Sequence, residues 1–361
     1  MSLKVNIKKK YKDFSLSVDF SSDSKRIGIL GASGSGKSMT LGAVAGLIKP
    51  DEGEIIFDGR VLFDSVGKTD IKTDRRKIGY LFQDYALFPH MTVEKNIRAA
   101  VDGARRIAAL KKKKPPSNES SFFQEKNTDT ILKQFGLFEV KDHLPSELSG
   151  GQKQRTALVR MLVTNPELLL LDEPFSALDT YLREGMRIEL CRILNEYNKT
   201  AVIVSHDRDE IYQMCDYLVL LDRGTMIARG KTEDLFRQPG TVAAARLTGC
   251  KNISAVERLG ENIIKALDWG GIELITEQKV DEHIRFAAVR AHDFIPGDTG
   301  INSVPVINPT VSTLPFEWYV MLENGLWWKI PKSLSEDTEE FEVPACISVK
   351  PEKILLMKSE E

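Results

Sequence analysis

Lys37 and Ser38 end a glycine-rich segment whose residue types suit phosphate binding. The segment reads Gly31-Ala-Ser-Gly-Ser-Gly-Lys-Ser38 and matches the pattern G-x-x-x-x-G-K-[ST] at every fixed position. Glycines allow the backbone to curl so that several N–H groups point into one concavity. The lysine ammonium can then reach the β- and γ-phosphates of a nucleotide, while the serine hydroxyl can ligate Mg²⁺. The segment therefore predicts a phosphate-binding P-loop.

Two carboxylates, Asp172 and Glu173, follow an apolar run at residues 168–171. A run that is apolar at every position is typical of a central parallel strand that is covered on both faces. At its carboxyl end, Asp172 can hold Mg²⁺ directly or through water, and Glu173 can orient or deprotonate an attacking water. Two acids after a strand can also form an ordinary solvated loop, and the P-loop is what favours the functional interpretation.

Three more polar positions could serve the same site. The segment Leu148-Ser-Gly-Gly-Gln152 precedes a predicted helix, and small residues at a helix start can expose N–H groups to an anion, although a flexible turn is the alternative. Gln83 lies at the end of a predicted strand. His206 ends another strand, from which its tip can reach the γ-phosphate at the carboxyl edge of the sheet, although a lone histidine is often structural.

The surrounding pattern predicts the elements that must position these residues. The predicted elements are two strands within 1–20, a strand at 26–30, a helix at 40–48, a strand and turn at 54–59, a strand at 79–84, mainly helical residues at 93–164 with one helix at 153–164, an amphipathic helix at 188–197, a strand at 201–206, and a hairpin of 217–221 and 225–229. The P-loop thus has the strand before it and the helix after it that the motif requires. A charged, proline-broken segment at 111–121 is interpreted as a solvated surface insertion.

Taken in chain order, these motifs resemble those of the ATP-binding subunit of ABC transporters, over about residues 1–240. The order is Walker A (31–38), Q-loop (Gln83), the LSGGQ signature (148–152), Walker B (168–173), D-loop (Ser176-Ala-Leu-Asp179) and H-loop (His206). The resemblance implies an α/β P-loop NTPase domain with a mixed sheet and a helical subdomain at about 91–164. It also implies that the chain binds and hydrolyses MgATP as a head-to-tail dimer, with each ATP between Walker A of one copy and the signature of the other.

The resemblance assigns roles residue by residue. Glu173, His206 and Gln83 would be catalytic, and the Mg²⁺ ligands would be Ser38, Gln83 and Asp172. The residues implied to contact the nucleotide are Tyr11, Gly31, Ala32, Ser33, Gly34, Ser35, Gly36, Lys37, Ser38, Met39, Ser149, Gly150, Gly151, Gln152 and Asp179. Tyr11 is our choice for the aromatic ring that stacks on adenine, with Phe14 as the second choice and a core position as the alternative for both.

Length and composition narrow the classes of protein. A chain of 361 residues suggests two to three domains, and 42% apolar residues suffice for sizeable cores. The formal net charge of −2 gives no support for nucleic-acid binding or for electrostatic adhesion to anionic lipid, so no nucleic-acid partner is expected. No apolar run approaches the ~18–20 residues that span a bilayer. Together with the resemblance to a transporter subunit, this implies a peripheral protein at the cytoplasmic face of the cell membrane, whose pore is another chain.

The composition changes near Gln238-Pro-Gly240, which suggests one domain at 1–238 and a second at 241–361. In the second region, short β-rich pieces alternate with turns, as in a small barrel. The predicted strands are 262–267, 271–276, 283–291, 317–322, 326–330 and 345–349. The segment 289–295 (V-R-x-x-x-F-I) has a faint echo at 349–355 (V-K-x-x-x-I-L). Two OB-like units that share strands would explain the echo, and so would coincidence.

This second region resembles the small all-β, OB-like TOBE domain of import ATPases, and more narrowly that of molybdate-type importers. Supporting segments in the first region are 58–62 and 75–90, although the Q-D-x-x-L-F-P-H version at 83–90 is shared with sulfate, phosphonate-type, iron and polyamine importers. The Ser-Ala-Arg-Asn oxyanion element of that group would fall on Gly249-Cys-Lys-Asn252, where the serine is lost and lysine replaces arginine. Backbone N–H groups and Lys251 can still hold a tetraoxyanion, together with Asn252. An exposed loop is the alternative.

The function that these observations favour is that of the ATPase of an oxyanion importer, for molybdate or tungstate. The alternatives are import of another solute (sulfate, iron or a polyamine), a soluble ABC ATPase that acts on DNA or ribosomes, and an anion sensor with a degenerate ATPase. The implied partners are a second copy of the chain, two transmembrane permease subunits and, indirectly, an extracytoplasmic solute-binding protein. We expect an exposed surface at Tyr85, Leu87 and Phe88 to dock onto the permease, unless these side chains pack inside the subdomain.

Overall fold

The structure is a computed structural model that describes residues 2–110, 128–332 and 342–359. The predicted insertion at 111–121 lies outside these residues. The chain divides into two compact units, Met1–Thr232 and Glu233–Glu361. Within the described ranges, no helix combines the length and the apolar composition that crossing a membrane requires.

The first unit is built on one eleven-stranded sheet in the order β6-β5-β4-β1-β2-β11-β10-β3-β9-β8-β7. Its parallel strands are β3 (Arg26–Gly31), β7 (Ile78–Leu81), β8 (Leu168–Asp172), β9 (Thr200–Ser205) and β10 (Tyr217–Asp222). Its mainly antiparallel strands are β1 (Leu3–Lys10), β2 (Ser15–Ser22), β4 (Glu52–Phe57), β5 (Arg60–Asp64), β6 (Thr69–Asp70) and β11 (Thr225–Lys231). The sheet is therefore mixed, as expected.

Burial of side chains follows this division of the sheet. Strands β3, β8 and β9 are buried at every position, because helices or other strands cover both of their faces. In contrast, β1 and β2 alternate between buried and less buried residues, so that one of their faces reaches solvent. The strands predicted at 26–30 and 168–171 are confirmed. The strand predicted at 201–206 is observed as β9, which ends one residue earlier and leaves His206 exposed after it.

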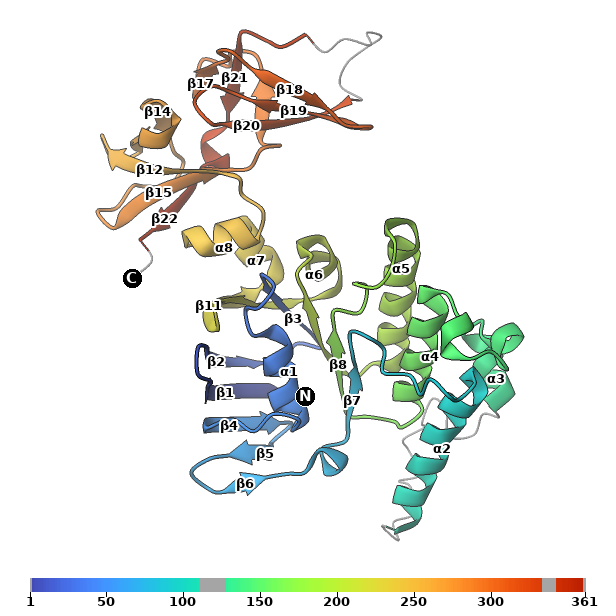
Figure 1. Ribbon diagram of the computed structural model, residues 1–361. Helices are drawn as coiled ribbons and strands as arrows, with labels where there is room; N and C mark the ends of the chain where they lie inside the picture. Colours follow the sequence, from blue (N-terminus) through green and yellow to red (C-terminus); the bar gives the residue numbers. More distant parts are fainter. Residues whose placement is uncertain (1, 111–127, 333–341, 360–361) are drawn as a thin grey trace. The chain divides into compact units, whose positions relative to one another are not determined.

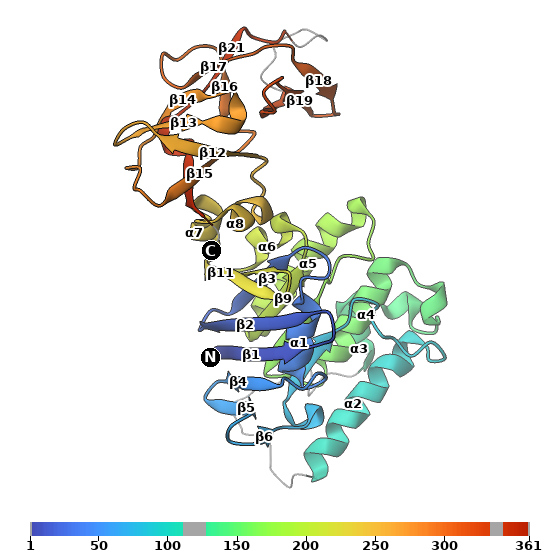
Figure 2. The ribbon, with the colours of Figure 1, turned by 60° about the vertical axis from the view of Figure 1, so that its left-hand side comes forward.

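Helix α1 and the helices α2, α3 and α4 lie in different parts of the first unit. Helix α1 packs into the main core beside β1, β2, β3 and β8, whereas α2, α3 and α4 lie together beyond β7 (Figures 1 and 2). The helices are α1 (Lys37–Ala45), α2 (Val93–Leu110), α3 (Thr128–Gln134), α4 (Gly150–Leu162), α5 (Thr180–Tyr197) and α6 (Arg208–Met214), with short 3₁₀ turns at Thr73–Arg75, Phe138–Val140 and Pro145–Glu147. The mainly helical stretch predicted from residue 93 is thus observed in the described residues.

The second unit is an all-β, OB-like domain preceded by two short helices, α7 (Thr232–Arg237) and α8 (Val242–Leu247). It contains a five-stranded sheet, β14-β13-β12-β15-β22, and two three-stranded sheets, β16-β21-β17 and β18-β19-β20. The strands are β12 (Asn252–Arg258), β13 (Ile263–Ala266), β14 (Ile272–Ile275), β15 (Ile284–Val289), β16 (Phe294–Pro296), β17 (Ser303–Pro305), β18 (Thr310–Thr313), β19 (Glu317–Met321), β20 (Trp327–Pro331), β21 (Cys346–Val349) and β22 (Leu355–Lys358), with 3₁₀ turns at Leu267–Trp269 and Pro351–Lys353. Buried tryptophans, including Trp269, Trp318 and Trp328, fill its core.

The echo between 289–295 and 349–355 marks two equivalent crossings between sheets. The chain leaves β15 at Val289 and enters β16, and it later leaves β21 at Val349 and enters β22. Strand β15 pairs with β22, and β16 pairs with β21, so the two crossings exchange the same pair of sheets. Each crossing contains one matching backbone hydrogen bond, from Asp293 N to Arg290 O and from Lys353 N to Lys350 O, both at 3.0 Å. This geometry favours the interpretation of shared strands over coincidence.

Candidate functional site

The P-loop lies between the end of β3 and the start of α1. Gly36 is the residue before α1 and has φ 99°, a left-handed conformation that favours glycine. A Cβ at Gly36 would also lie 2.6 Å from Leu16 Cδ1, so a larger residue would push against the core. The loop therefore turns tightly into the helix. The N–H groups of the first helical turn, which have no partner within the helix, then point into the concavity of the P-loop.

Lys37 is buried at the first position of α1, with its ammonium surrounded by oxygen atoms. Lys37 Nζ donates hydrogen bonds to the carbonyl oxygens of Gly31 and Ala32, both at 2.9 Å, and lies 3.6 Å from Glu173 Oε1. Burial lowers the pKa of Lys37, and the neighbouring Glu173 carboxylate opposes that effect. A buried cation with an acidic neighbour is suited to exchange that neighbour for a phosphate oxygen.

Asp172 is the last residue of β8, and two hydroxyl groups hold its carboxylate. Ser38 Oγ donates to Asp172 Oδ1 at 2.8 Å, and the Tyr80 hydroxyl donates to Oδ2 at 2.9 Å. Burial raises the pKa of Asp172, whereas these two hydrogen bonds lower it. A serine hydroxyl and a carboxylate in contact are the hard oxygen donors that Mg²⁺ prefers. The structure thus brings together two of the predicted metal ligands.

Tyr80 is a site residue that we did not predict from the sequence. Its hydroxyl reaches Asp172 because β7 is the parallel neighbour of β8, with Tyr80 opposite Leu170. The signal in the sequence was a tyrosine, with its polar hydroxyl, in an apolar strand just before Gln83. Interpreting that signal requires knowledge of which strand lies beside β8. Burial, followed by the nearby Asp172 carboxylate, raises the pKa of Tyr80.

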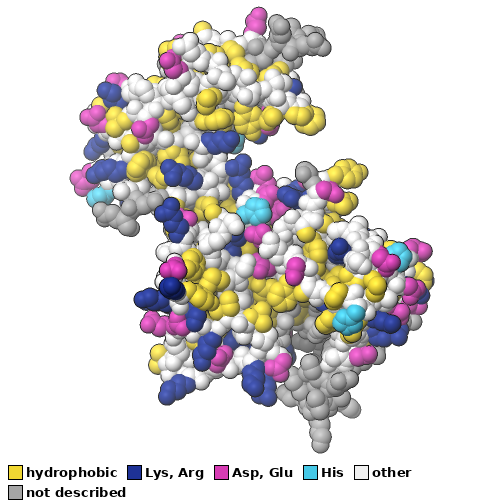
Figure 3. Space-filling model, in the orientation of Figure 1, with side chains coloured by type: hydrophobic (Ala, Val, Ile, Leu, Met, Phe, Trp, Pro, Cys, Tyr) yellow, Lys and Arg dark blue, Asp and Glu magenta, His cyan; other side chains and the backbone are white. Residues whose placement is uncertain are grey.

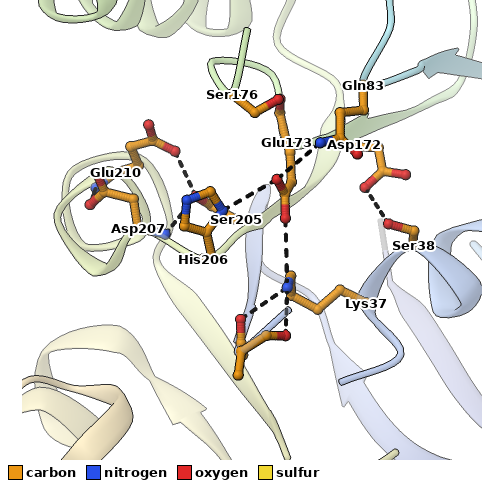
Figure 4. A network of polar contacts seen from close by, with 12 residues as sticks. Lys37, Ser38, Gln83, Asp172, Glu173, Ser176, Ser205, His206, Asp207 and Glu210 are labelled. Atoms are coloured by element: carbon orange, nitrogen blue, oxygen red, sulfur yellow. Dashed lines mark hydrogen bonds and ion pairs between the residues drawn. The ribbon is translucent and has the colours of Figure 1, made fainter. Parts of the chain in front are cut away.

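Glu173 is the centre of the polar network (Figure 4). Immediately after β8 its backbone takes φ 42°, which turns the chain out of the strand direction. Its Oε2 atom lies 3.2 Å from His206 Nδ1 and accepts a hydrogen bond from Gln83 Nε2 at 3.4 Å, while Oε1 faces Lys37. One carboxylate therefore contacts three of the residues that we predicted from separate motifs.

His206 follows β9, and the turn that carries it is held by buried polar contacts. Ser205 Oγ donates to Glu210 Oε2 at 2.6 Å and accepts a hydrogen bond from Asp207 N at 2.9 Å. Asp207 caps α6, since its side chain accepts hydrogen bonds from the N–H groups of Asp209 and Glu210. Burial raises the pKa of Glu210. His206 itself is exposed, so its ring is free to meet a ligand.

The signature segment lies at a different place from the P-loop network. Ser149 caps α4 in a reciprocal arrangement with Gln152: Ser149 Oγ accepts from Gln152 N at 3.3 Å, and Ser149 N donates to Gln152 Oε1 at 2.9 Å. A Cβ at Gly150 would lie 2.9 Å from Leu178 Cδ2, so the signature packs against the D-loop. Among the hydrogen bonds and ion pairs of the described residues, none joins the signature to the P-loop.

The remaining residues that were predicted to contact the nucleotide lie in different surroundings. Tyr11 is 41% exposed, with Lys9 Nζ 5.6 Å from the centre of its ring, whereas Phe14 is half-buried and packs against the main core. The Met39 side chain also packs against that core. The group of Met39 that can face a nucleotide is therefore its backbone N–H, in the first turn of α1. Asp179 caps α5 by accepting a hydrogen bond from Leu182 N at 2.9 Å. Ala32, Ser33 and Gly34 are exposed on the P-loop.

Two expectations outside the P-loop network need correction. Tyr85 is not exposed: it is buried, which raises its pKa to about 12, while Leu87 is half-buried and Phe88 is 44% exposed. Asn252 is not available as an anion ligand, because its amide is buried and exchanges two hydrogen bonds with the backbone of Trp327, at 2.7 and 2.8 Å. The Lys251 ammonium lies over the rings of Tyr319 and Trp327, at 5.2 and 4.8 Å.

Comparison with known proteins supports the interpretation of the motifs. A family model described as ABC transporter matches residues 12–176. The "Fe(3+) ions import ATP-binding protein FbpC" of Haemophilus influenzae is 31% identical over 289 residues, which cover 80% of this chain and 78% of that protein. The "Molybdenum import ATP-binding protein ModC" of Paramagnetospirillum magneticum is 35% identical over 238 residues, 66% of this chain and 61% of that protein.

Two further matches bear on the cargo and on the fold. A "Probable sulfate/thiosulfate import ATP-binding protein CysA" of Chlorella vulgaris is 37% identical over 225 residues, 62% of this chain and 87% of that protein. A solved dimeric structure of an ATP-binding cassette, in a post-hydrolysis state with ADP and Pi bound, matches with a TM-score of 0.50 and 29% identity. That match covers 64% of this chain and 99% of the solved chain.

Proposed function

The chain belongs to the ABC transporter family of ATP-binding proteins, and from this premise we propose that it is the ATPase of an importer for a tetrahedral oxyanion, with molybdate or tungstate as the cargo. The observation that carries the ATPase role is the Glu173 carboxylate, which contacts Lys37, His206 and Gln83 at once. Four motifs far apart in the sequence thus meet at the carboxyl edge of the parallel strands, where ligands bind in α/β sheets.

The P-loop half of the site binds the phosphates. Lys37 exchanges its contacts with Gly31 O, Ala32 O and Glu173 for phosphate oxygens, and the N–H groups at the start of α1 complete the anion site. Ser38 and Asp172 hold Mg²⁺, which supplies charge neutralisation on the phosphates when it is bound. Gln83 is the third proposed metal ligand. Tyr11 is the proposed ring for adenine, since it is exposed whereas Phe14 packs inward.

Glu173 activates the water that attacks the γ-phosphate. Its position directly after Asp172 places it beside the metal ligand without making it one. Once Lys37 has turned to the phosphates, Glu173 keeps His206 and Gln83 as neighbours, and it is then free to orient the water and to take its proton. His206 is proposed to contact the γ-phosphate from the end of β9.

A second copy of the chain completes the site. Ser149, Gly150, Gly151 and Gln152 begin helix α4, which presents N–H groups at its start but no bond to the P-loop of the same chain. In the proposed head-to-tail dimer this helix start meets the γ-phosphate held by the partner copy, with Asp179 of the adjacent D-loop at the interface. ATP then closes the dimer, and hydrolysis with product release opens it.

The proposed cargo rests on the relatives and on two segments of this chain. Molybdate and sulfate, for which two of the relatives are named, are both tetrahedral oxyanions, and segments 58–62 and 75–90 resemble the molybdate-type group. Fe³⁺ is the second candidate. The Haemophilus relative aligns over 289 residues, which exceeds the 232 residues of the first unit, so that alignment must enter the second unit.

The transmembrane partners are proposed to be two permease subunits, with a solute-binding protein acting on the far side of the membrane. The loop that carries Phe88 is held firmly, since Phe88 N donates to Asn96 Oδ1 at 2.9 Å and Asn96 Nδ2 donates to Phe88 O at 3.2 Å. A fixed, exposed apolar ring suits docking onto another protein. On the face of the molecule in Figure 3, basic and acidic side chains are interspersed.

Transport by the reconstituted complex tests the proposal. The chain would be co-expressed with candidate permease subunits, reconstituted into vesicles with ATP on the side of this subunit, and supplied with radioactive molybdate. We expect molybdate uptake by the wild type and no uptake by Glu173→Gln. Excess tungstate should inhibit the uptake of molybdate more strongly than excess sulfate does. Uptake of Fe³⁺ without uptake of molybdate would replace the first candidate cargo by the second.

Cross-linking tests the docking surface. A cysteine introduced at Phe88 is expected to form a cross-link with the co-expressed permease, whereas one at Val66, which is 90% exposed on the turn between β5 and β6, is not. The unsubstituted chain, with half-buried Cys191 and Cys346, gives the background. Cross-links at position 66 alone would place the permease on another face.

A further inference from the structure

The carboxylate of Asp172 is held at both of its oxygen atoms, and one of the two donors lies outside the Walker, Q-loop, signature, D-loop and H-loop motifs. Ser38 Oγ donates to Oδ1 at 2.8 Å, and the Tyr80 hydroxyl donates to Oδ2 at 2.9 Å. One hydrogen bond leaves a carboxylate free to rotate about its Cβ–Cγ bond, whereas two donors on opposite oxygens determine the plane of the group. We propose that Tyr80 is a positioning residue that orients the Asp172 carboxylate for Mg²⁺.

Packing determines where the Tyr80 hydroxyl can lie. Strand β7 is hydrogen-bonded to β8 in parallel register, with Tyr80 opposite Leu170, two residues before Asp172. The Tyr80 ring is half-buried, packs against the main core, and lies 4.3 Å from the ring of Phe82 at an interplanar angle of 30°. The ring is therefore held by its neighbours, and the hydroxyl meets Asp172 at a set position.

The hydrogen bond from Tyr80 also leaves room for a metal ion. Each carboxylate oxygen offers two lone-pair positions, and Ser38 and Tyr80 use one on each atom. A second lone pair on each oxygen remains for a metal ion or for its bound water. Removal of the Tyr80 hydroxyl would leave Ser38 as the single donor, so that binding of Mg²⁺ would have to restrict the carboxylate as well.

The chain provides a matched control in Tyr85. Tyr85 lies four residues after the end of β7, is 4% exposed, and within the described residues its hydroxyl has no hydrogen-bond partner. Tyr85→Phe and Tyr80→Phe delete the same atom from a buried and a half-buried tyrosine in one segment. Only Tyr80→Phe removes a contact with a proposed metal ligand.

The test measures how much Mg²⁺ strengthens nucleotide binding to the full-length protein. The dissociation constant of a fluorescent ATP analogue is determined in EDTA and in Mg²⁺ for the wild type, Tyr80→Phe, Tyr85→Phe and Asp172→Asn. For Tyr80→Phe we expect the constant in EDTA to be unchanged and the strengthening by Mg²⁺ to fall about 3- to 10-fold, the size of one hydrogen bond. The Mg²⁺ concentration for half-maximal ATPase should rise by a similar factor, with kcat at saturating Mg²⁺ within about twofold. Tyr85→Phe should match the wild type.

Two outcomes would overturn the inference. Unchanged Mg²⁺ dependence in Tyr80→Phe would show that the hydroxyl does not position Asp172. An equal loss of affinity in EDTA and in Mg²⁺ would show a general structural role instead. The inference rests on the proposed metal role of Asp172, and Asp172→Asn separates the two: if that variant retains the full strengthening by Mg²⁺, the metal assignment itself fails. Thermal unfolding of each variant without ligand verifies that it folds.

Discussion

The two halves of the proposed ATP site differ in how many of their contacts lie within one chain. In the P-loop half, Glu173 contacts Lys37, Gln83 and His206, so that four separate segments of the chain meet. Beside it, Asp172 accepts a hydrogen bond from Ser38. In the signature half, the hydrogen bonds of Ser149 and Gln152 within the described part of the chain join them to each other and to their own helix. The first half is therefore preorganised within the monomer, while the second is a capped helix start. This difference predicts that nucleotide binding and dimer closure can be separated by mutation.

Loss of the buried ammonium should give the largest effect. Lys37→Ala is expected to weaken ATP binding by about 100-fold or more, because several charge-assisted hydrogen bonds to phosphate are lost together. Isothermal titration calorimetry with MgATP measures the affinity. Lys49→Ala, which removes an exposed lysine in the same unit, is the control and should bind as the wild type does. ATP binding by Lys37→Ala near wild-type affinity would contradict the role of the P-loop lysine.

Glu173→Gln should lose hydrolysis but keep ATP. The amide cannot take a proton from water, so the rate is expected to fall by about 10²- to 10⁴-fold. The variant should bind MgATP and accumulate as a closed dimer, which light scattering after size-exclusion chromatography detects. Glu167→Gln, just before the opposite end of β8, is the control. Turnover at the normal rate by Glu173→Gln would remove Glu173 from its proposed role.

Ser149→Asp should separate the two halves. Aspartate caps a helix as well as serine does, so α4 stays capped, but its negative charge would face the γ-phosphate of the partner copy. In the Glu173→Gln background we expect MgATP affinity of the monomer within about threefold of the parent and loss of the ATP-dependent dimer. Ser149→Thr, which keeps a neutral hydroxyl cap, should still dimerise. Normal dimerisation by Ser149→Asp would place the signature away from the nucleotide.

The smallest effect concerns the buried carboxyl group behind His206. Burial raises the pKa of Glu210 above its usual value. The protonated carboxyl group therefore contributes to the free energy of unfolding at low pH, and this contribution is lost as pH rises through the raised pKa. Glu210→Gln cannot ionise and still accepts from Ser205. Its melting temperature relative to the wild type should therefore increase by about 1–4 °C between pH 5 and pH 8. Glu184 is exposed, so Glu184→Gln should show no such trend. If the melting temperature of Glu210→Gln did not rise relative to the wild type, the raised pKa of Glu210 would be contradicted.

Local patterns were sufficient for the elements but not for every residue within them. The P-loop and the buried strands could be predicted because glycine, lysine and apolar residues at set spacings leave few alternative structures. Tyr85 was misassigned because an aromatic residue in a loop gives no local signal of which face it takes. Asn252 was misassigned for a related reason: its amide is satisfied by the backbone of Trp327, 75 residues away in the sequence.

Residue types and their spacing were enough to predict which chemical groups are present, the strand or helix that carries each of them, and the resemblance to an ATP-binding family. Which of these groups meet depends on how the elements pack. Lys37, Gln83, Glu173 and His206 lie on four separate segments, and their contacts depend on the order of parallel strands in the sheet. Tyr80 reaches Asp172 for the same reason, because β7 lies beside β8 although 86 residues separate their nearest ends. Hydrogen bonds between strands set such neighbours, and nothing in the local sequence specifies them.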